Sequence, residues 1–409
     1  MSKVVSPAYV VSPLRTPTGK RGGALSRLHP ATLGATLAKE IVKRADLDPS
    51  FIDEAIGGNA TGTGKQGNNL MEKVMQEAGY GTIIHASTVN DLCGSSAQAT
   101  RLAAGLVESG NDDVVLVMGV ENNHVVFQGQ DLMPSSNSFK GTIKTAWQTI
   151  KLGPKVITLS LPKGYALYPM GKYGDAIARE RGFSRRELDA FGFSSQMKAA
   201  YAMQTGRFKD EIVTVQTPVG YLDFDEGIRP DTSPEAMAKL KPSFGKDGLH
   251  TPGTSSQISA AAAGYLVVNE QALKNHKLTP MARIVASAVV KTDSQKPGQH
   301  LIGPIDAIKK VLAKANLKIE DIGLFEINEA FASVVLAAQK ELNIPIEKIN
   351  VNGGAIALGH ALGTSGARLP VTGIHEAHKR NAEGNPVKYV LTTLCIGGGQ
   401  AIAIIFEMV

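Results

Sequence analysis

The chain has 409 residues, enough for two or more domains, and its 43% hydrophobic and 20% charged residues are typical of a globular protein. Its net charge of +6 includes no long lysine or arginine run and only 5% of residues are aromatic, which argues against a nucleic-acid-binding surface. Two cysteines exclude a disulfide framework and a CxxC metal site, and no apolar stretch reaches the length of a membrane span.

A helix and strand near the start of the chain recur near its end. Residues 35–59 contain an amphipathic helix, an A-x-L sequence, a short acidic spacer and an apolar strand, and residues 307–328 repeat this order. Aligned without gaps, the two segments share identical residues that include Ala45 and Ala315, Leu47 and Leu317, and Ile52 and Ile322. The alternative to duplication is chance similarity.

Cys93 follows the first repeat unit and lies in the segment VNDLCGSSAQ, where small residues lead into a predicted helix. Unpaired backbone N–H groups and the positive end of the dipole at a helix N-terminus favour a thiolate. Cys93 is therefore a candidate nucleophile. The alternative is a buried structural cysteine.

The next segments predict a core strand and then a long excursion from the core. Residues 113–118 form an apolar run, as expected for a buried strand of an α/β fold. Residues 121–250 are rich in proline, glycine and serine, which is typical of a lid or binding surface. Within them a helix is predicted at Ser184–Thr205, with Ser184 and Glu187 as a capping box. Residues 258–268 return to core-like composition.

The apolar strand at 322–327 ends in Asn328 and Glu329. Polar residues at the carboxyl end of a strand are where α/β folds place ligand contacts, so Asn328 is a candidate site residue. The alternative is that Asn328 caps the following helix.

His360 and Cys395 complete the candidate site. His360 lies in a glycine-rich segment, NGGAIALGHALGTSG, at the repeat position opposite Cys93, which favours a role as base. Cys395 ends a second buried strand at 389–394 and precedes Gly397, the first of three glycines whose amides can form an oxyanion cradle.

Together these segments resemble the thiolase family, and the resemblance covers nearly the whole chain. It implies an α/β protein with a duplicated α/β/α/β/α layered fold and two similar halves. The predicted boundaries are residues 1–120 with 251–275 for the first half and 276–409 for the second. Residues 121–250 would form an inserted loop domain that binds coenzyme A (CoA) and the acyl group.

The resemblance also implies roles for the reacting groups. Cys93 would carry the acyl group as a thioester, His360 would remove the thiol proton, and Cys395 would act as the second acid and base. Asn328 would hold a water that forms one oxyanion hole together with His360. The backbone amides of Cys93 and Gly397 would form the other. The implied activity is reversible thiolytic cleavage of a 3-oxoacyl-CoA, or the reverse Claisen condensation, with CoA as co-substrate and no permanently bound cofactor or metal.

Four further positions match the substrate-binding residues of the family. Phe244 and Ser256 would hold the pantetheine arm, and Met170 and Phe331 would line the acyl pocket. The chain departs from the family pattern around these positions. Its departures include Ala361 in place of proline, Ser96 in place of glycine, Thr254 in place of asparagine, Pro169 in place of histidine, and the segment MGKYGD at 170–175. We therefore expect an unusual substrate with a longer, branched or aromatic acyl chain.

Two other functions fit parts of the pattern. A ketosynthase-like condensing enzyme would use a cysteine but would leave Cys395 without a role, and a non-catalytic or partner-dependent thiolase-like subunit would explain the altered loops. The resemblance implies a homodimer or homotetramer that binds acyl-CoA and CoA, with a partner subunit as a further option. The sparse cysteines and the absence of a secretory signal predict a cytoplasmic protein.

Overall fold

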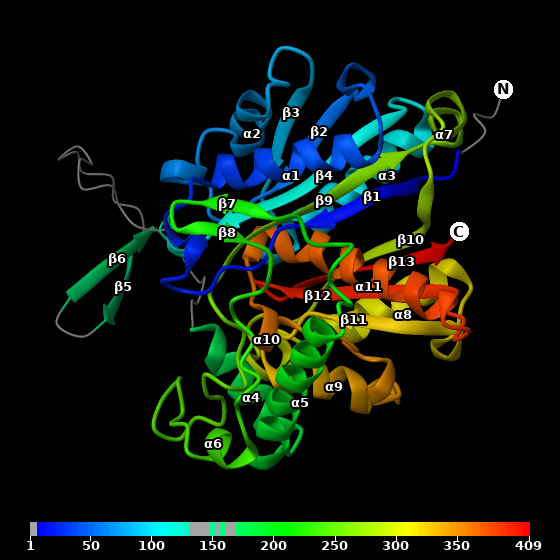
Figure 1. Ribbon diagram of the computed structural model, residues 1–409. Helices are drawn as coiled ribbons and strands as arrows, with labels where there is room; N and C mark the ends of the chain where they lie inside the picture. Colours follow the sequence, from blue (N-terminus) through cyan, green and yellow to red (C-terminus); the bar gives the residue numbers. More distant parts are fainter. Residues whose placement is uncertain (1–5, 129, 131–146, 153–154, 161–168) are drawn as a thin grey trace.

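The computed structural model describes residues 6–128, 130, 147–152, 155–160 and 169–409. Within these residues the centre of the molecule is a mixed nine-stranded sheet in the order β11-β12-β13-β10-β1-β9-β4-β2-β3 (Figure 1). Its strands are β1 (Tyr9–Arg15), β2 (Glu54–Gly58), β3 (His85–Val89), β4 (Val114–Asn122), β9 (Ala260–Val268), β10 (Pro280–Lys291), β11 (Ile322–Ile327), β12 (Tyr389–Ile396) and β13 (Gln400–Met408).

The strand pairing confirms the predicted duplication. In the first half β2 runs parallel to β4, and β4 pairs antiparallel with β9. In the second half β11 runs parallel to β12, and β12 pairs antiparallel with β13. The halves join where β1 pairs antiparallel with β10, with Tyr9 opposite Arg283. The two similar halves therefore share one continuous sheet.

Helices cover the sheet in layers, and each layer has its own apolar core. The outer helices α1 (Pro30–Arg44) and α2 (Leu70–Ala78) pack on the first half, and α8 (Gly303–Ala315) and α9 (Ala332–Leu342) pack on the second. In α1 the buried residues Leu33, Leu37 and Ile41 recur at helical spacing and form the face that meets the sheet. No helix of the described ranges combines the length and apolar character needed to cross a bilayer.

The two central helices, α3 (Ser95–Ser109) and α11 (Ser365–Ala382), lie between the halves and share a core with the inner sheet faces. Small residues let them approach closely at their N-termini. A Cβ atom at Gly366 would lie 2.3 Å from the backbone nitrogen of Ala97, closer than atoms can pack. This close contact brings the segments that contain Cys93 and His360 together.

The predicted insertion contains most of the remaining elements, and its residues 129, 131–146, 153–154 and 161–168 lie outside the described residues. Helix α5 (Arg185–Gln204) begins after Ser184, and both bonds of the predicted capping box with Glu187 are present. The other elements outside the central sheet are β5 (Trp147–Leu152), β6 (Lys155–Ser160), α4 (Met170–Glu180), β7 (Val215–Thr217), β8 (Gly220–Leu222), α6 (Pro234–Ala238), α7 (Glu270–His276) and α10 (Ala355–Leu358).

A buried ion-pair cluster fastens this region to the central sheet. Arg15, at the end of β1, is 1% exposed and contacts Glu211 at 2.6 Å and Asp225 at 2.7 Å. Both carboxylates are also buried, so losing either would leave an uncompensated charge in the interior. The cluster therefore fixes the insertion against the first half.

Candidate active site

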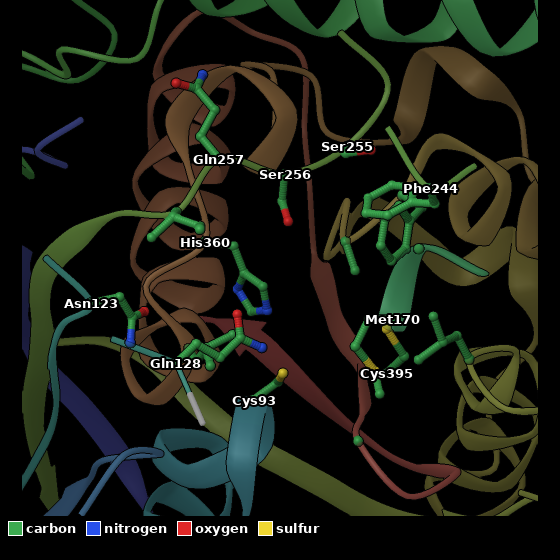
Figure 2. A pocket seen from close by; sticks show the side chains of 17 residues that line it. Cys93, Asn123, Gln128, Met170, Phe244, Ser255, Ser256, Gln257, His360 and Cys395 are labelled. Carbon is green, nitrogen blue, oxygen red and sulfur yellow. The ribbon is translucent and has the colours of Figure 1, made fainter. Parts of the chain in front are cut away.

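Cys93 lies in a sharp turn between β3 and α3. Residues Leu92–Gly94 form a single 3-10 turn, and Leu92 has a φ of 49°, which is rare for a residue with a side chain. The Ser95 hydroxyl accepts from the Asp91 amide at 2.9 Å and donates to the Leu92 carbonyl at 2.6 Å, which stabilises this turn. The turn presents the half-buried Cys93 thiol to a cavity at the start of the helix (Figure 2).

His360 follows the short helix α10, and its ring is held by one neighbour. The ring Nδ1 lies 2.6 Å from the Ser365 hydroxyl, which donates its own proton to the Ala361 carbonyl at 3.1 Å. Because that hydroxyl must then accept from the ring, Nδ1 carries the imidazole proton and Nε2 carries a lone pair. His360 is thus oriented to accept a proton at Nε2.

Asn328 lies beside this free nitrogen. Its Nδ2 is 3.5 Å from His360 Nε2, and its Oδ1 is buried without a hydrogen-bond partner in the structure. A buried amide oxygen without a partner is costly, so this position suits a bound water or substrate group. The alternative prediction of a helix cap is wrong, because the N-cap of α9 is Phe331 and no side chain caps that helix.

The neighbouring Glu329 has a structural role instead. Its carboxylate accepts from Ser195 at 2.7 Å, from Asn350 at 2.9 Å and from the Ile356 amide at 3.0 Å. These bonds connect α5 and the segment that precedes His360. Glu329 therefore supports the His360 loop from outside the cavity.

Cys395 is the penultimate residue of β12, and its side chain is buried against the second-half core. A cavity of about 320 Å³ joins it to Cys93 and His360, and Figure 2 shows the three side chains around the same space. Every other predicted site residue except Asn328 also lines this cavity. Its lining consists of Cys93, Asn123, Gln128, Met170, Gly171, Phe244, Ser255, Ser256, Gln257, Ile258, Leu301, Ala330, Phe331, His360, Leu362, Cys395 and Gly397.

Burial sets the protonation states of the three groups. It raises the pKa of Cys93 to about 12, which a hydrogen bond from the Gly397 amide partly offsets and the Glu121 carboxylate increases. Burial, with the nearby charge of Arg368, lowers the pKa of His360 to about 4. Burial and the neighbouring Cys93 raise the pKa of Cys395. The resting site therefore holds two neutral thiols and a neutral imidazole, and the expectation of a thiolate favoured by the helix N-terminus is wrong for this state.

The raised pKa of Cys93 predicts how its reactivity changes with pH. Far below the pKa the thiolate fraction rises about tenfold per pH unit. The rate of alkylation of Cys93 by iodoacetamide should therefore rise about tenfold for each pH unit between about pH 6 and 9. The measurement is the second-order rate constant at each pH, with the modified peptide identified by mass spectrometry. A rate that is constant across this range would indicate a preformed thiolate and contradict the prediction.

Sequence profiles of the N-terminal and C-terminal thiolase domains match residues 8–271 and 278–408. The chain belongs to the thiolase family. It is 39% identical over 403 residues to an acetyl-CoA acetyltransferase of Syntrophomonas wolfei, covering 97% of this chain and 98% of the relative.

Solved thiolase structures agree in fold. The crystal structure of human mitochondrial 3-ketoacyl-CoA thiolase in complex with CoA has a TM-score of 0.87 and 33% identity, and covers 99% of each chain. The Bacillus anthracis acetyl-CoA acetyltransferase structure has a TM-score of 0.88 and 31% identity, and covers 100% of each chain. The predicted family and fold are thus confirmed.

At three of the positions where the sequence departs from the thiolase pattern, the structure shows hydrogen bonds that do not involve the thiols of the site. The Ser96 hydroxyl accepts from the Ala367 amide at 2.9 Å and ties α3 to α11. The Thr254 hydroxyl accepts from the Thr251 amide at 2.9 Å and lies 3.0 Å from His250 Nδ1. At position 361 the backbone carbonyl, which proline would supply equally, accepts the bond from Ser365 that orients His360, so the replacement of proline by Ala361 leaves this bond intact. None of the three removes a reacting group of the thiolase site.

Several residues around this thiolase site were not found from the sequence. Asn123 and Gln128 line the cavity, Ser365 orients His360, and Glu121 accepts from the Gly363 amide at 3.0 Å and the Ala60 amide at 2.7 Å. Glu121 had a detectable signal, because it is a carboxylate inside an apolar strand. Ser365 had none, because its role depends on a contact between the first residue of α11 and His360 in the segment before that helix.

Proposed function

We propose that this thiolase-family chain is an acyltransferase that uses CoA to cleave 3-oxoacyl-CoA reversibly into acetyl-CoA, or another acyl-CoA, and a shortened acyl-CoA. The observation that carries the proposal is that Cys93 from the first half and His360 and Cys395 from the second all line one cavity. A nucleophile, a base and a second acid are the groups that breaking a carbon–carbon bond through a thioester requires.

In the thiolytic direction His360 Nε2 accepts the proton of Cys93, and the resulting thiolate attacks the 3-oxo carbon of the substrate. The C2–C3 bond breaks, its electron pair passes to C2, and the Cys395 thiol protonates that carbon to release acetyl-CoA. The thiol of free CoA then gives its proton to the Cys395 thiolate and attacks the acyl-enzyme. The Cys93 thiolate leaves, and it recovers its proton from His360.

Two sets of donors stabilise the oxyanions of this sequence. The first is the pair of backbone amides of Cys93 and Gly397, and it is supported by the bond that the Gly397 amide already makes to the Cys93 sulfur. The second is His360 with a water held by Asn328, and it is supported by the unpaired Oδ1 of Asn328, whose Nδ2 lies 3.5 Å from His360 Nε2. Donors held in place before the reaction need no reorganisation during it.

The substrate-binding part of the cavity is apolar on one wall. Phe244 and Phe331 pack edge to face with ring centroids 5.7 Å apart, and Met170 lies beside them. We assign Met170 and Phe331 to the acyl group and Phe244 and Ser256 to the pantetheine arm. Because Met170 and Phe244 come from residues 121–250, this supports the assignment of that region to CoA and acyl binding. The apolar wall favours a longer, branched or aromatic acyl chain.

Steady-state thiolysis by the purified full chain tests this function. We expect acetyl-CoA to form from free CoA and a panel of 3-oxoacyl-CoA substrates with short, long, branched and aryl chains, with a higher kcat/KM for the larger chains than for acetoacetyl-CoA. A kcat/KM for acetoacetyl-CoA equal to the others would contradict the substrate preference. No acetyl-CoA from any substrate would favour the non-catalytic or partner-dependent subunit.

We further propose that the protein is a cytoplasmic homodimer or homotetramer. A reducing compartment is supported by the two free cysteines, which both have to stay reduced for the proposed chemistry. Association with a second copy is supported by β3, which lies at the edge of the central sheet and directly precedes the Cys93 turn. Sedimentation analysis of the full chain distinguishes monomer, dimer and tetramer, and would also reveal a partner subunit in a purified complex.

A further inference from the structure

His300 is a buried histidine behind the cavity that the proposed reaction does not use. It follows β10, and only 4% of its surface is exposed. Its Nε2 lies 3.1 Å from the Gly398 backbone nitrogen, and its Nδ1 lies 3.1 Å from the Ser294 carbonyl oxygen. Because a backbone N–H can only donate, Nε2 accepts from Gly398 and Nδ1–H donates to Ser294. Both ring nitrogens are therefore satisfied by a neutral imidazole.

The bond from Gly398 is one of several that fix the glycine turn to residues 291–300. The Gly399 carbonyl accepts from the Thr292 amide at 2.7 Å and the Thr292 hydroxyl at 3.0 Å. The Gly398 carbonyl accepts from Lys291 Nζ at 2.5 Å. Gly398 and Gly399 have φ values of 81° and 76°, which only glycine adopts readily, so the turn depends on these contacts for its position.

The peptide unit that His300 holds is next to the one that faces Cys93. Gly398 N–H belongs to the peptide between residues 397 and 398, and the preceding peptide carries the Gly397 N–H that donates to the Cys93 sulfur. Consecutive peptide planes share one Cα atom, so fixing the first plane restricts the rotation of the second. His300 thus acts on the donor without touching the reacting atoms.

One face of the His300 ring packs against α4, in the segment where the sequence departs from the thiolase pattern. Tyr173, in the MGKYGD segment, stacks on His300 with ring centroids 3.8 Å apart and planes inclined by 8°. The next residue, Leu301, lines the cavity. A path of direct contacts therefore leads from α4 through His300 to the glycine turn.

We infer that His300 is a positioning residue that aims the Gly397 amide at Cys93 by accepting a hydrogen bond from Gly398. The inference rests on the proposed function for its catalytic consequence, but its geometric content concerns the Cys93 sulfur alone. The titratable groups near the ring include Tyr173 on one face and Lys291 beside the turn, and the Glu180 carboxylate packs against Gly298, two residues before His300. Burial and the Lys291 charge lower the pKa of His300, which keeps Nε2 available as an acceptor at neutral pH.

Three substitutions separate this role from simple packing. His300→Gln keeps an acceptor near the position of Nε2, His300→Asn keeps a donor near Nδ1 but cannot reach Gly398, and His300→Leu removes both groups. Losing an oxyanion donor altogether costs about 10²–10³ in kcat, and a donor that is displaced but present costs less. We therefore expect kcat for thiolysis to fall about tenfold in His300→Asn and His300→Leu, with KM nearly unchanged.

Alkylation of Cys93 by iodoacetamide gives a second readout that needs no thiolysis. We expect its rate at pH 8 to fall about fivefold in His300→Asn and His300→Leu and to stay near the unmodified level in His300→Gln, because the Gly397 amide stabilises the thiolate. Equal rates in the Asn and Gln variants would overturn the inference, even if the Leu variant does not fold. An unmodified chain without thiolysis would refute the proposed function and leave this comparison to decide the role of His300.

Discussion

Replacing Cys93 with alanine is expected to lower kcat for thiolysis by about four orders of magnitude, because the acyl-enzyme can no longer form and only binding and the oxyanion donors remain. Incubation of the unmodified chain with an acyl-CoA should add the acyl mass to the peptide that contains Cys93. The measurements are steady-state thiolysis and mass spectrometry of the trapped enzyme, with the alanine variant in parallel.

The control for this substitution is stability. Cys93 is half-buried and lines the cavity, so removing its sulfur should leave the thermal unfolding midpoint nearly unchanged. A well-folded alanine variant that retains thiolysis within tenfold of the unmodified chain would refute Cys93 as the nucleophile. So would an acyl adduct found on another residue.

Replacing Cys395 with alanine is expected to lower thiolysis by about three orders of magnitude but to spare acyl transfer between CoA thioesters. Protonating the carbon that leaves in thiolysis requires the second acid, and the Cys395 thiolate left by that step is what takes the proton of the incoming CoA. In exchange between CoA thioesters no carbanion forms, so Cys395 keeps its proton, and the proton that His360 takes from Cys93 passes to the departing CoA thiolate. Exchange of isotopically labelled CoA into an acyl-CoA measures transfer alone. The contrast between the two rates assigns Cys395 to the carbon–carbon step.

This contrast also separates the thiolase proposal from a ketosynthase-like enzyme. Condensation that survives in the alanine variant would show that Cys395 has no part in the chemistry. Because Cys395 is buried in the second-half core, a Cys395→Ser variant of nearly the same size should be measured beside it. Serine fills the space but is a far weaker acid, so it should restore stability without restoring thiolysis.

The fold was predictable where short-range patterns repeat. The identical pairs 270 positions apart, such as Leu47 and Leu317, follow helix and strand periodicities that act locally, and both copies form the same elements. That the two halves share a single sheet was not predictable. The sheet is joined by the pairing of β1 with β10, where Tyr9 lies opposite Arg283, and the sequence of a strand does not state which other strand it pairs with.

The candidate site was predictable where chemistry is rare in the sequence. The chain has only two cysteines, and both line the cavity with His360. The supporting contacts were not predictable. Asn328 and Glu329 are adjacent and both polar, yet one lies beside His360 and the other braces a loop, because the chain turns between β11 and α9. The resting thiol of Cys93 also depends on burial, which no local pattern reports.

The close contact between Gly366 and Ala97 positions the reacting groups by means that do not involve the aromatic wall of the cavity. Two small residues fix the distance between the central helices, and the turns that carry the nucleophile and the base lie at the ends of those helices. The aromatic pair Phe244 and Phe331 forms a different wall. Evolution, or an engineer, can therefore reshape that wall for new acyl chains without disturbing the reacting groups, whereas one added methyl group at Gly366 would push them apart.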